Sequence, residues 1–374
     1  MNPLILAAAF TLAVLPDTQN MIPNSQDTVM SSADQTQRDE FLERYALLRA
    51  STEWMAAQAP QRNLKVGVHV GDVIAGGSAN IVSRITPGQW AAARALLDPL
   101  AAAFPWVISR GNHDDVVGWL ANFGPGWHEA QVRPGVRWVG AAGPATSSLV
   151  PRAPDPTLGT TAVTDGDTLA LAVRVHRDYE LLVLTVSCRP SAAEVLWARQ
   201  AIAAHAGPVV LVAHMVTFPG SSTDPRPGYH VLSGTTQPTC DDSQGPAFRV
   251  WDGLVVPQPQ KVLAVVSGHF SGAFVGIVSV GAQGFPVLDL QLDYQWTADR
   301  GGNGWFALAQ FDPDTGSVAV ETLSPGLTGA TPKNTLGQHR LTGTIPWTGR
   351  FKTSTAPATP APELPPEPPT VLTP

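Results

Sequence analysis

Five short apolar runs in the chain stop abruptly on a carboxylate, an amide or an imidazole. They are TLAVLPD ending on Asp17, KVGVHVGD ending on Asp72, WVISRGNHD ending on Asn112, His113 and Asp114, PVVLVAH ending on His214, and KVLAVVSGH ending on His269. In open α/β sheets, ligands bind outside the carboxyl ends of the strands. Strands of such a fold would therefore bring these side chains to one edge, where oxygen and imidazole donors suit a divalent metal ion.

The elements between these runs indicate a layered fold. Apolar residues at helical spacing predict three helices, over residues 31–60, 87–103 and 191–205. Pro87 suits the first position of a helix, and Ser191 suits an N-cap. From residue 273 to 323 the pattern is all strand, and FDPDTGSVAV predicts a hairpin. This order predicts an α/β or α/β/β/α domain with a sheet core.

Composition excludes some classes of protein. The chain has 374 residues, 44% of them hydrophobic, which is ample for a large buried core. Its net charge is −7 and it has no long basic run, which argues against an extended nucleic-acid surface. No apolar run reaches the length of a transmembrane segment. Cys188 and Cys240 could form one disulfide in an oxidising compartment or remain two thiols.

Five short motifs carry a family resemblance. PDTQ (16–19), GD (71–72), GNHD (111–114), AH (213–214) and GHFS (268–271) follow one another in this order. The chain resembles the calcineurin-like metallophosphoesterases, whose motifs are Asp-x-His, Gly-Asp, Gly-Asn-His-Asp/Glu, a lone His and Gly-His-x-His. The match runs from residue 10 to about 325. The PDTQ form and the segment 302–325 are similar to a bacterial subgroup that is often exported.

The resemblance implies an architecture and its limits. The expected fold is α/β: a four-layer α/β/β/α sandwich with two mixed β-sheets flanked by helices. The phosphoesterase domain would cover residues 1–350, and residues 351–374 would be a proline-rich tail or linker without packed structure. The tail and the subgroup favour a secreted or envelope protein. The opening segment lacks the basic residues of a signal peptide, so a cytoplasmic location is the alternative.

The resemblance also implies roles for the residues in the motifs. Asp72 would bridge two divalent metals, Asn112, His214 and His269 would complete the second, and Asp17 and Gln19 would bind the first. His113 would face the leaving group or a phosphate oxygen, and Asp114 would orient the imidazole of His113. His69, within the VGVHV run, is predicted to be a buried core histidine instead.

The chain departs from the family pattern at two positions. Gln19 stands in place of the His of Asp-x-His, and Ser271 in place of the last His of Gly-His-x-His. By the family layout, both missing imidazoles belong to the first metal. We therefore expect that position to hold two carboxylates, the amide oxygen of Gln19 and the hydroxyl of Ser271. Such an oxygen-rich position should bind more weakly and favour Mn²⁺, Mg²⁺ or Ca²⁺ over Zn²⁺. The two metal positions together would be filled by two divalent ions from among Mn, Fe, Zn, Mg and Ca.

The expected activity is hydrolysis of a small phosphomonoester or phosphodiester by a metal-activated hydroxide. His113 would protonate the leaving group. A degenerate member that binds metal without turnover is the main alternative, supported by Gln19 and Ser271. A nuclease is a third interpretation, disfavoured by the acidic balance of the chain. Substrate choice would come from the loops 115–165 and 215–247, and nothing in the sequence predicts the oligomeric state.

Overall fold

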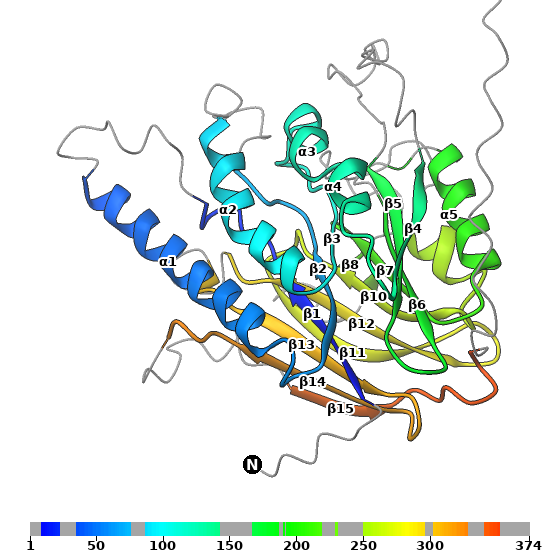
Figure 1. Cartoon of the computed structure of the whole chain (residues 1–374). Coiled ribbons are helices and arrows are strands. Elements are labelled where there is room, and N and C mark those ends of the chain that lie inside the picture. Colours follow the sequence, from blue (N-terminus) through cyan, green and yellow to red (C-terminus); the bar gives the residue numbers. More distant parts are fainter. Residues whose placement is uncertain are drawn as a thin grey trace, which may run out of the picture.

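The computed structural model describes residues 9–22, 35–75, 87–142, 167–186, 190, 192–218, 229–230, 250–295, 302–327 and 340–351. Two β-sheets form the centre of this part of the chain, with helices on their outer sides (Figure 1). Residues 352–374 of the predicted proline-rich tail, Ser191, both cysteines and most of the loop 215–247 lie outside these residues. None of the helices in the described ranges is long and apolar enough to cross a membrane.

The first sheet has six strands in the order β15-β14-β13-β1-β2-β3. The strands are β1 (Phe10–Leu15), β2 (Leu64–His69), β3 (Trp106–Ile108), β13 (Phe306–Asp312), β14 (Ser317–Leu323) and β15 (Arg340–Thr344). β1, β2 and β3 are parallel, so their carboxyl ends share one edge. β13, β14 and β15 add an antiparallel half, and the predicted hairpin forms the β13–β14 turn.

The second sheet has seven strands in the order β11-β12-β10-β7-β6-β5-β4. The strands are β4 (Val136–Ala142), β5 (Thr168–Arg174), β6 (Glu180–Val186), β7 (Val209–Ala213), β10 (Val262–Ser267), β11 (Gly272–Val280) and β12 (Phe285–Asp293). β6, β7, β10 and β12 run parallel, with antiparallel strands at both edges. Two short strands, β8 (Thr217–Phe218) and β9 (Tyr229–His230), form a separate antiparallel sheet.

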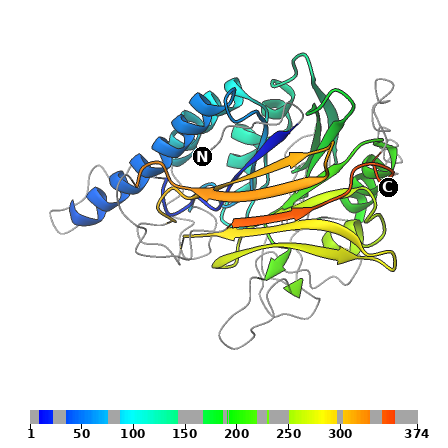
Figure 2. The same cartoon turned by 90° about the horizontal axis from the view of Figure 1, so that it is seen from below.

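The helices complete the predicted sandwich. α1 (Gln35–Gln58) and α2 (Pro87–Ala103) pack on the first sheet, while α5 (Ala192–Ala204) and a π-helix (Trp251–Val255) pack on the second. α3 (Val116–Phe123) and α4 (Pro125–Glu129) follow β3. In Figure 2, the orange and red strands β13–β15 lie beside the yellow strands β11 and β12. The α/β/β/α architecture with two mixed sheets is therefore confirmed.

Both faces of the second sheet are covered, and its strands therefore have apolar side chains on both faces. In β7, Val210 and Val212 face the core between the sheets, whereas Val209 and Leu211 face the core under α5. Side chains alternate between the faces of a strand, so a continuous apolar run is what a doubly covered strand requires. α3, α4, β4 and β15 were not predicted, because their segments are short or rich in glycine and polar residues.

Candidate metal centre

The carboxyl ends of strands from both sheets meet at one place. β1, β2 and β3 lead to Asp17, Asp72 and Asn112, while β7 and β10 lead to His214 and His269. The turns that carry them are unusual: Asp72 has a φ of 52° and His269 a φ of 68°, both in the left-handed region. A Cβ on Gly111 would lie 2.1 Å from Asp72 Oδ1, so the GNHD turn requires glycine there.

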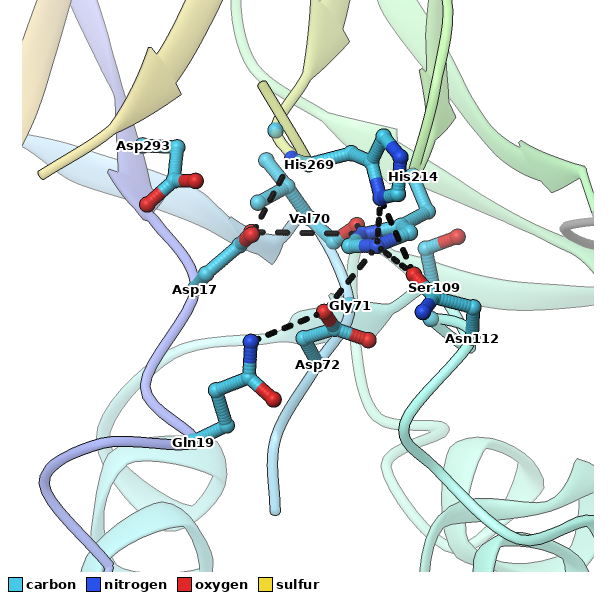
Figure 3. Close-up of polar contacts among 12 residues, drawn as sticks. Asp17, Gln19, Val70, Gly71, Asp72, Ser109, Asn112, His214, His269 and Asp293 are labelled. Carbon is cyan, nitrogen blue, oxygen red and sulfur yellow. Dashed lines mark hydrogen bonds and ion pairs between the residues drawn. The ribbon is translucent and has the colours of Figure 1, made fainter. Parts of the chain in front are cut away.

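Four side chains, from Asp72, Asn112, His214 and His269, form what we call the histidine cluster (Figure 3). His214 Nε2 lies 3.2 Å from Asp72 Oδ2, 2.8 Å from Asn112 Oδ1 and 3.2 Å from His269 Nδ1. His269 Nδ1 also lies 2.9 Å from Asn112 Oδ1. A tetrahedral ion bound at about 2.0–2.1 Å keeps its ligand atoms about 3.3 Å apart. The cluster is therefore close to the size that an ion requires.

The protonation of the histidines suits metal binding. His214 Nδ1 lies 3.1 Å from the carbonyl oxygen of Val70, so it carries the proton and leaves the Nε2 lone pair facing the cluster. Burial, and then His214, lower the pKa of His269 to about 3, which keeps this ring neutral. Burial alone would lower the pKa of His214, but the Asp72 carboxylate raises it overall. In the absence of an ion, a proton on His214 would supply the positive charge that offsets the Asp72 carboxylate.

A second group, which we call the carboxylate cluster, adjoins Asp72 and consists of Asp17, Gln19, Asp293 and Gln295. Gln19 Nε2 donates to Asp72 Oδ2 at 3.1 Å and to Gln295 Oε1 at 2.7 Å. Gln295 Nε2 donates to Asp293 Oδ2 at 3.1 Å and to Asp17 Oδ2 at 3.5 Å. All four residues are at most 5% exposed. Side-chain amides thus link three buried carboxylates.

Burial, and after it repulsion between carboxylates, raises the pKa values in the carboxylate cluster. Burial, together with Asp293 and Asp72, raises the pKa of Asp17 well above its usual value. Burial also raises the pKa of Asp293 to about 6. Asp17 Oδ2 accepts the backbone N–H of His269 at 3.0 Å, whereas Asp17 Oδ1 is buried without a hydrogen-bond partner in the described part of the chain. Asp17 Oδ1 also lies 3.9 Å from His214 Nδ1, which forms an ion pair with it only when that imidazole is protonated.

The GNHD turn is held by buried polar contacts. Asp114 Oδ1 accepts the N–H of Ile74 at 3.0 Å, and Asp114 Oδ2 accepts that of Gly111 at 2.9 Å. Backbone amides thus engage both oxygens of Asp114, and its expected role in orienting the His113 ring stays a prediction. His113 N donates to Asp72 Oδ1 at 2.8 Å, and its half-buried ring has no partner for Nδ1 among the described residues. Burial and Asp72 raise the pKa of Asp114 to about 7.

His69 lies beneath the turns. It is fully buried, as predicted, and its Nδ1 accepts the N–H of Gly71 at 3.1 Å. Its Nε2 therefore carries the proton and lies 3.1 Å from Thr18 Oγ1, which donates to the carbonyl oxygen of Val73 at 3.0 Å. Burial lowers the pKa of His69 to about 3. His69 thus joins the turn that carries Asp17 to the turn that carries Asp72.

The structure therefore brings most of the predicted metal ligands together, with the exception of Ser271. Ser271 is exposed and shares no hydrogen bond with either cluster in the described residues. Asp293 and Gln295 were missed, although Asp293 ends β12, which is parallel to β10. The strand-end rule that identified the other residues would have included Asp293. The alternation in VLDLQLD, typical of an ordinary strand, concealed it.

The donor set fits a metal ion. In the described ranges, one group of three carboxylate or histidine residues has its ligand atoms within 4.8 Å of one another, and it is Asp72, His214 and His269. Asn112 Oδ1 joins them, giving two nitrogen and two oxygen donors. Such a mixed set binds transition metals and zinc. The oxygens of the carboxylate cluster favour harder ions.

Comparisons with known proteins give only distant likenesses. No protein-family model and no curated protein matches the chain. Among solved structures, purple acid phosphatase PPD1 from yellow lupin seeds has a TM-score of 0.44 at 10% identity, over 91% of this chain and 55% of that one. GAP50, the anchor in the inner membrane complex of Plasmodium, gives 0.42 at 11%, over 93% and 90%. A putative 5'-nucleotidase from Staphylococcus aureus, in complex with alpha-ketoglutarate, gives 0.37 at 12%, over 93% and 56%. The chain thus spans little more than half the length of the lupin and Staphylococcus proteins.

Proposed function

We propose that the chain is a metal-dependent phosphoesterase that hydrolyses a small phosphomonoester or phosphodiester at a two-metal site. The observation that carries the proposal is the histidine cluster, in which donor atoms of Asp72, Asn112, His214 and His269 converge beside the GNHD turn. The sequence motifs that resemble metallophosphoesterases supply these same residues. The resemblance also supports an exported or envelope location as part of the proposal.

The proposed metal ligands fall into two sets that share Asp72. Asn112, His214 and His269 would complete one position, and Asp17 and Gln19 would contribute to the other. When bound, divalent ions supply a water whose pKa approaches neutrality and positive charge for the phosphoryl oxygens. The fixed tautomer of His214 and the N–H of His113 on Asp72 hold two of the ligands in place before any ion arrives.

The residues of the GNHD turn would act on the substrate. The His113 ring follows Asn112 directly and is half-buried, so a ring nitrogen on its exposed side could donate a proton to the leaving oxygen. Positioned acids of this kind contribute about 10²–10⁴-fold to the rate. Asp114 would act as a positioning residue, because it accepts the backbone N–H groups of Gly111 and Ile74.

The test is hydrolysis of an aryl phosphomonoester and an aryl phosphodiester with added Mn²⁺, for the wild type and His113→Ala. We expect Mn²⁺-dependent turnover that falls about 10²–10⁴-fold in His113→Ala, with unchanged metal content. The preferred ester would assign the substrate class. Turnover that persists in His113→Ala would remove this residue from the mechanism.

A second candidate function is metal-stabilised binding without turnover. The hydrogen bond from Gln19 to Asp72 Oδ2 favours it, because an amide there engages the oxygen that a bridging carboxylate would give to the first metal. A protein of this kind would bind one ion per chain and hydrolyse neither ester with any of Mn²⁺, Mg²⁺, Zn²⁺ or Ca²⁺. The same assay, run together with metal analysis, separates the two functions.

A further inference from the structure

We propose that Asp293 and Gln295 take the place of the two missing imidazoles, which makes the first metal position of this chain an all-oxygen site for a hard divalent cation such as Mn²⁺, Mg²⁺ or Ca²⁺. The inference rests on the proposed two-metal function, which it deepens. It assigns ligand roles to two residues outside the motifs and leaves Ser271 out of the site.

The contacts around Gln295 place Asp293 beside the residues expected at the first metal. A single nitrogen, Gln295 Nε2, lies 3.1 Å from Asp293 Oδ2 and 3.5 Å from Asp17 Oδ2. The oxygen of the same amide lies 2.7 Å from Gln19 Nε2, which in turn contacts Asp72. The backbone N–H of Gln295 also binds Asp293 Oδ1 at 2.9 Å, so the two residues form one unit at the end of β12.

The charge of this group requires compensation. Asp17, Asp72 and Asp293 are at most 2% exposed, and the amides of Gln19 and Gln295 carry no charge to offset them. Asp17 Oδ1 is buried with no hydrogen-bond partner among the described residues, and it lies 3.9 Å from His214 Nδ1, beyond hydrogen-bond distance. Buried carboxylates persist when they are paired or bind a metal, and a divalent ion is the compact way to neutralise several at once.

The amides of Gln19 and Gln295 can bind the carboxylates when no ion is present, and they could bind a cation when one is. A glutamine side chain presents either its N–H₂ group or its oxygen by rotation about its last bond, and the hydrogen-bond network decides which. Facing bare carboxylates, Gln19 and Gln295 present N–H groups. Facing a cation, the same amides would present oxygen, which gives up to five oxygen donors of the kind that Ca²⁺, Mn²⁺ or Mg²⁺ binds, with water free to complete the coordination.

The experiment is Mn²⁺ binding to the metal-free full chain, measured by electron paramagnetic resonance and by metal analysis, for the wild type and two variants. Asp293→Asn removes the proposed ligand. Asp289→Asn is the matched control, because Asp289 is a fully buried carboxylate on the same strand that binds Thr217 instead. Circular dichroism establishes that each variant is folded. Gln295→Glu, which adds a carboxylate at the site, is measured beside them.

We expect the wild type and Asp289→Asn to bind two Mn²⁺ ions, one tightly and one weakly. Asp293→Asn should keep the tight ion and lose about tenfold or more in affinity for the weak one, whereas Gln295→Glu should bind the weak ion more tightly. Unchanged weak binding in Asp293→Asn, an equal loss in Asp289→Asn, or a wild type that binds one ion at millimolar Mn²⁺ would overturn the inference. Because binding is measured without substrate, an inactive protein with the expected binding would refute only the proposed function.

Discussion

The histidine cluster and the carboxylate cluster share Asp72 and the same sheet edge, yet they are built in different ways. In the first, backbone groups fix the ligands: the carbonyl of Val70 binds His214, and the N–H of His113 binds Asp72. In the second, backbone N–H groups bind Asp17 and Asp293, and the amides of Gln19 and Gln295 link the carboxylates to one another through contacts between side chains. Asp72 thus belongs both to a cluster fixed by backbone groups and to one fixed largely by side-chain amides.

Rigidity in the histidine cluster has a cost in backbone strain. Asp72 and His269 adopt positive φ angles, which non-glycine residues rarely do and which cost of order 1–3 kcal/mol each. Neighbouring glycines with no Cβ make room for these turns, since a Cβ on Gly71 would lie 2.7 Å from the nitrogen of Gly111. Asp17 and Asp293 show no such angles. The strained turns therefore belong to the position that we expect to bind its ion tightly.

Asp72→Asn should have the largest effect, because it damages both clusters at once. Replacing the bridging carboxylate by an amide removes negative charge from both metal positions, so we expect turnover to fall by about 10³-fold or more. Metal analysis should find less than one ion per chain after dialysis. If the variant kept two ions with wild-type affinity, Asp72 would not be the residue that the clusters share.

Gln19→His should sharpen the comparison by making the two positions more alike. An imidazole in place of the amide adds a nitrogen donor, so we expect Zn²⁺ affinity at the weak position to rise about tenfold or more. Gln19→Asn is the matched control, because it keeps an amide and adds no imidazole. Competition with a zinc-binding dye measures the affinity. Equal affinities in the two variants would show that position 19 does not contact the ion.

His128 should have the smallest effect on the clusters, because it lies outside both. It is buried, with Nε2 accepting the N–H of Ile108 at 3.1 Å. Burial lowers its pKa from 6.5 to about 4. The unfolded chain therefore binds a proton first as the pH falls, and stability that is complete above about 6.5 is lost toward pH 4.

The measurement for His128 is urea unfolding of the metal-free protein at pH 7.5 and pH 5. Its contribution to the free energy of unfolding should fall by about 2 kcal/mol between these values. His128→Gln should be less stable at pH 7.5 but should lose about 2 kcal/mol less on acidification. Identical pH dependence in the two proteins would mean that His128 is not kept neutral by the fold.

Strong local signals made much of the fold predictable. The helix expected over residues 87–103 is α2 with the same bounds, because Pro87 marks its start and its apolar positions are regular. The apolar run KVGVHVGD overlaps β2, which covers Leu64–His69. Polar residues at strand ends predicted the meeting of Asp72, Asn112, His214 and His269, since parallel strands share an edge.

Contacts between distant segments could not be predicted in the same way. Gln19 and Gln295 are far apart in sequence and meet only because β1 and β12 end at the same place in different sheets. The partner of Asp114 was also hidden, because backbone amides have no sequence signature. Local patterns thus indicated which strand ends matter, and the packing of two sheets decided which side chains touch.

The division of the ligands between the sheets has a mechanical consequence. Asp17, Asp72 and Asn112 follow strands of the first sheet, whereas His214, His269 and Asp293 belong to the second. An ion held by both sets would act as a cross-link that resists sliding of one sheet over the other. At a free concentration one hundred times its Kd, a bound ion stabilises the folded state by about 2.7 kcal/mol. In this chain that free energy would be concentrated at the seam between the sheets, so the metal content would set how firmly the two halves of the sandwich hold together.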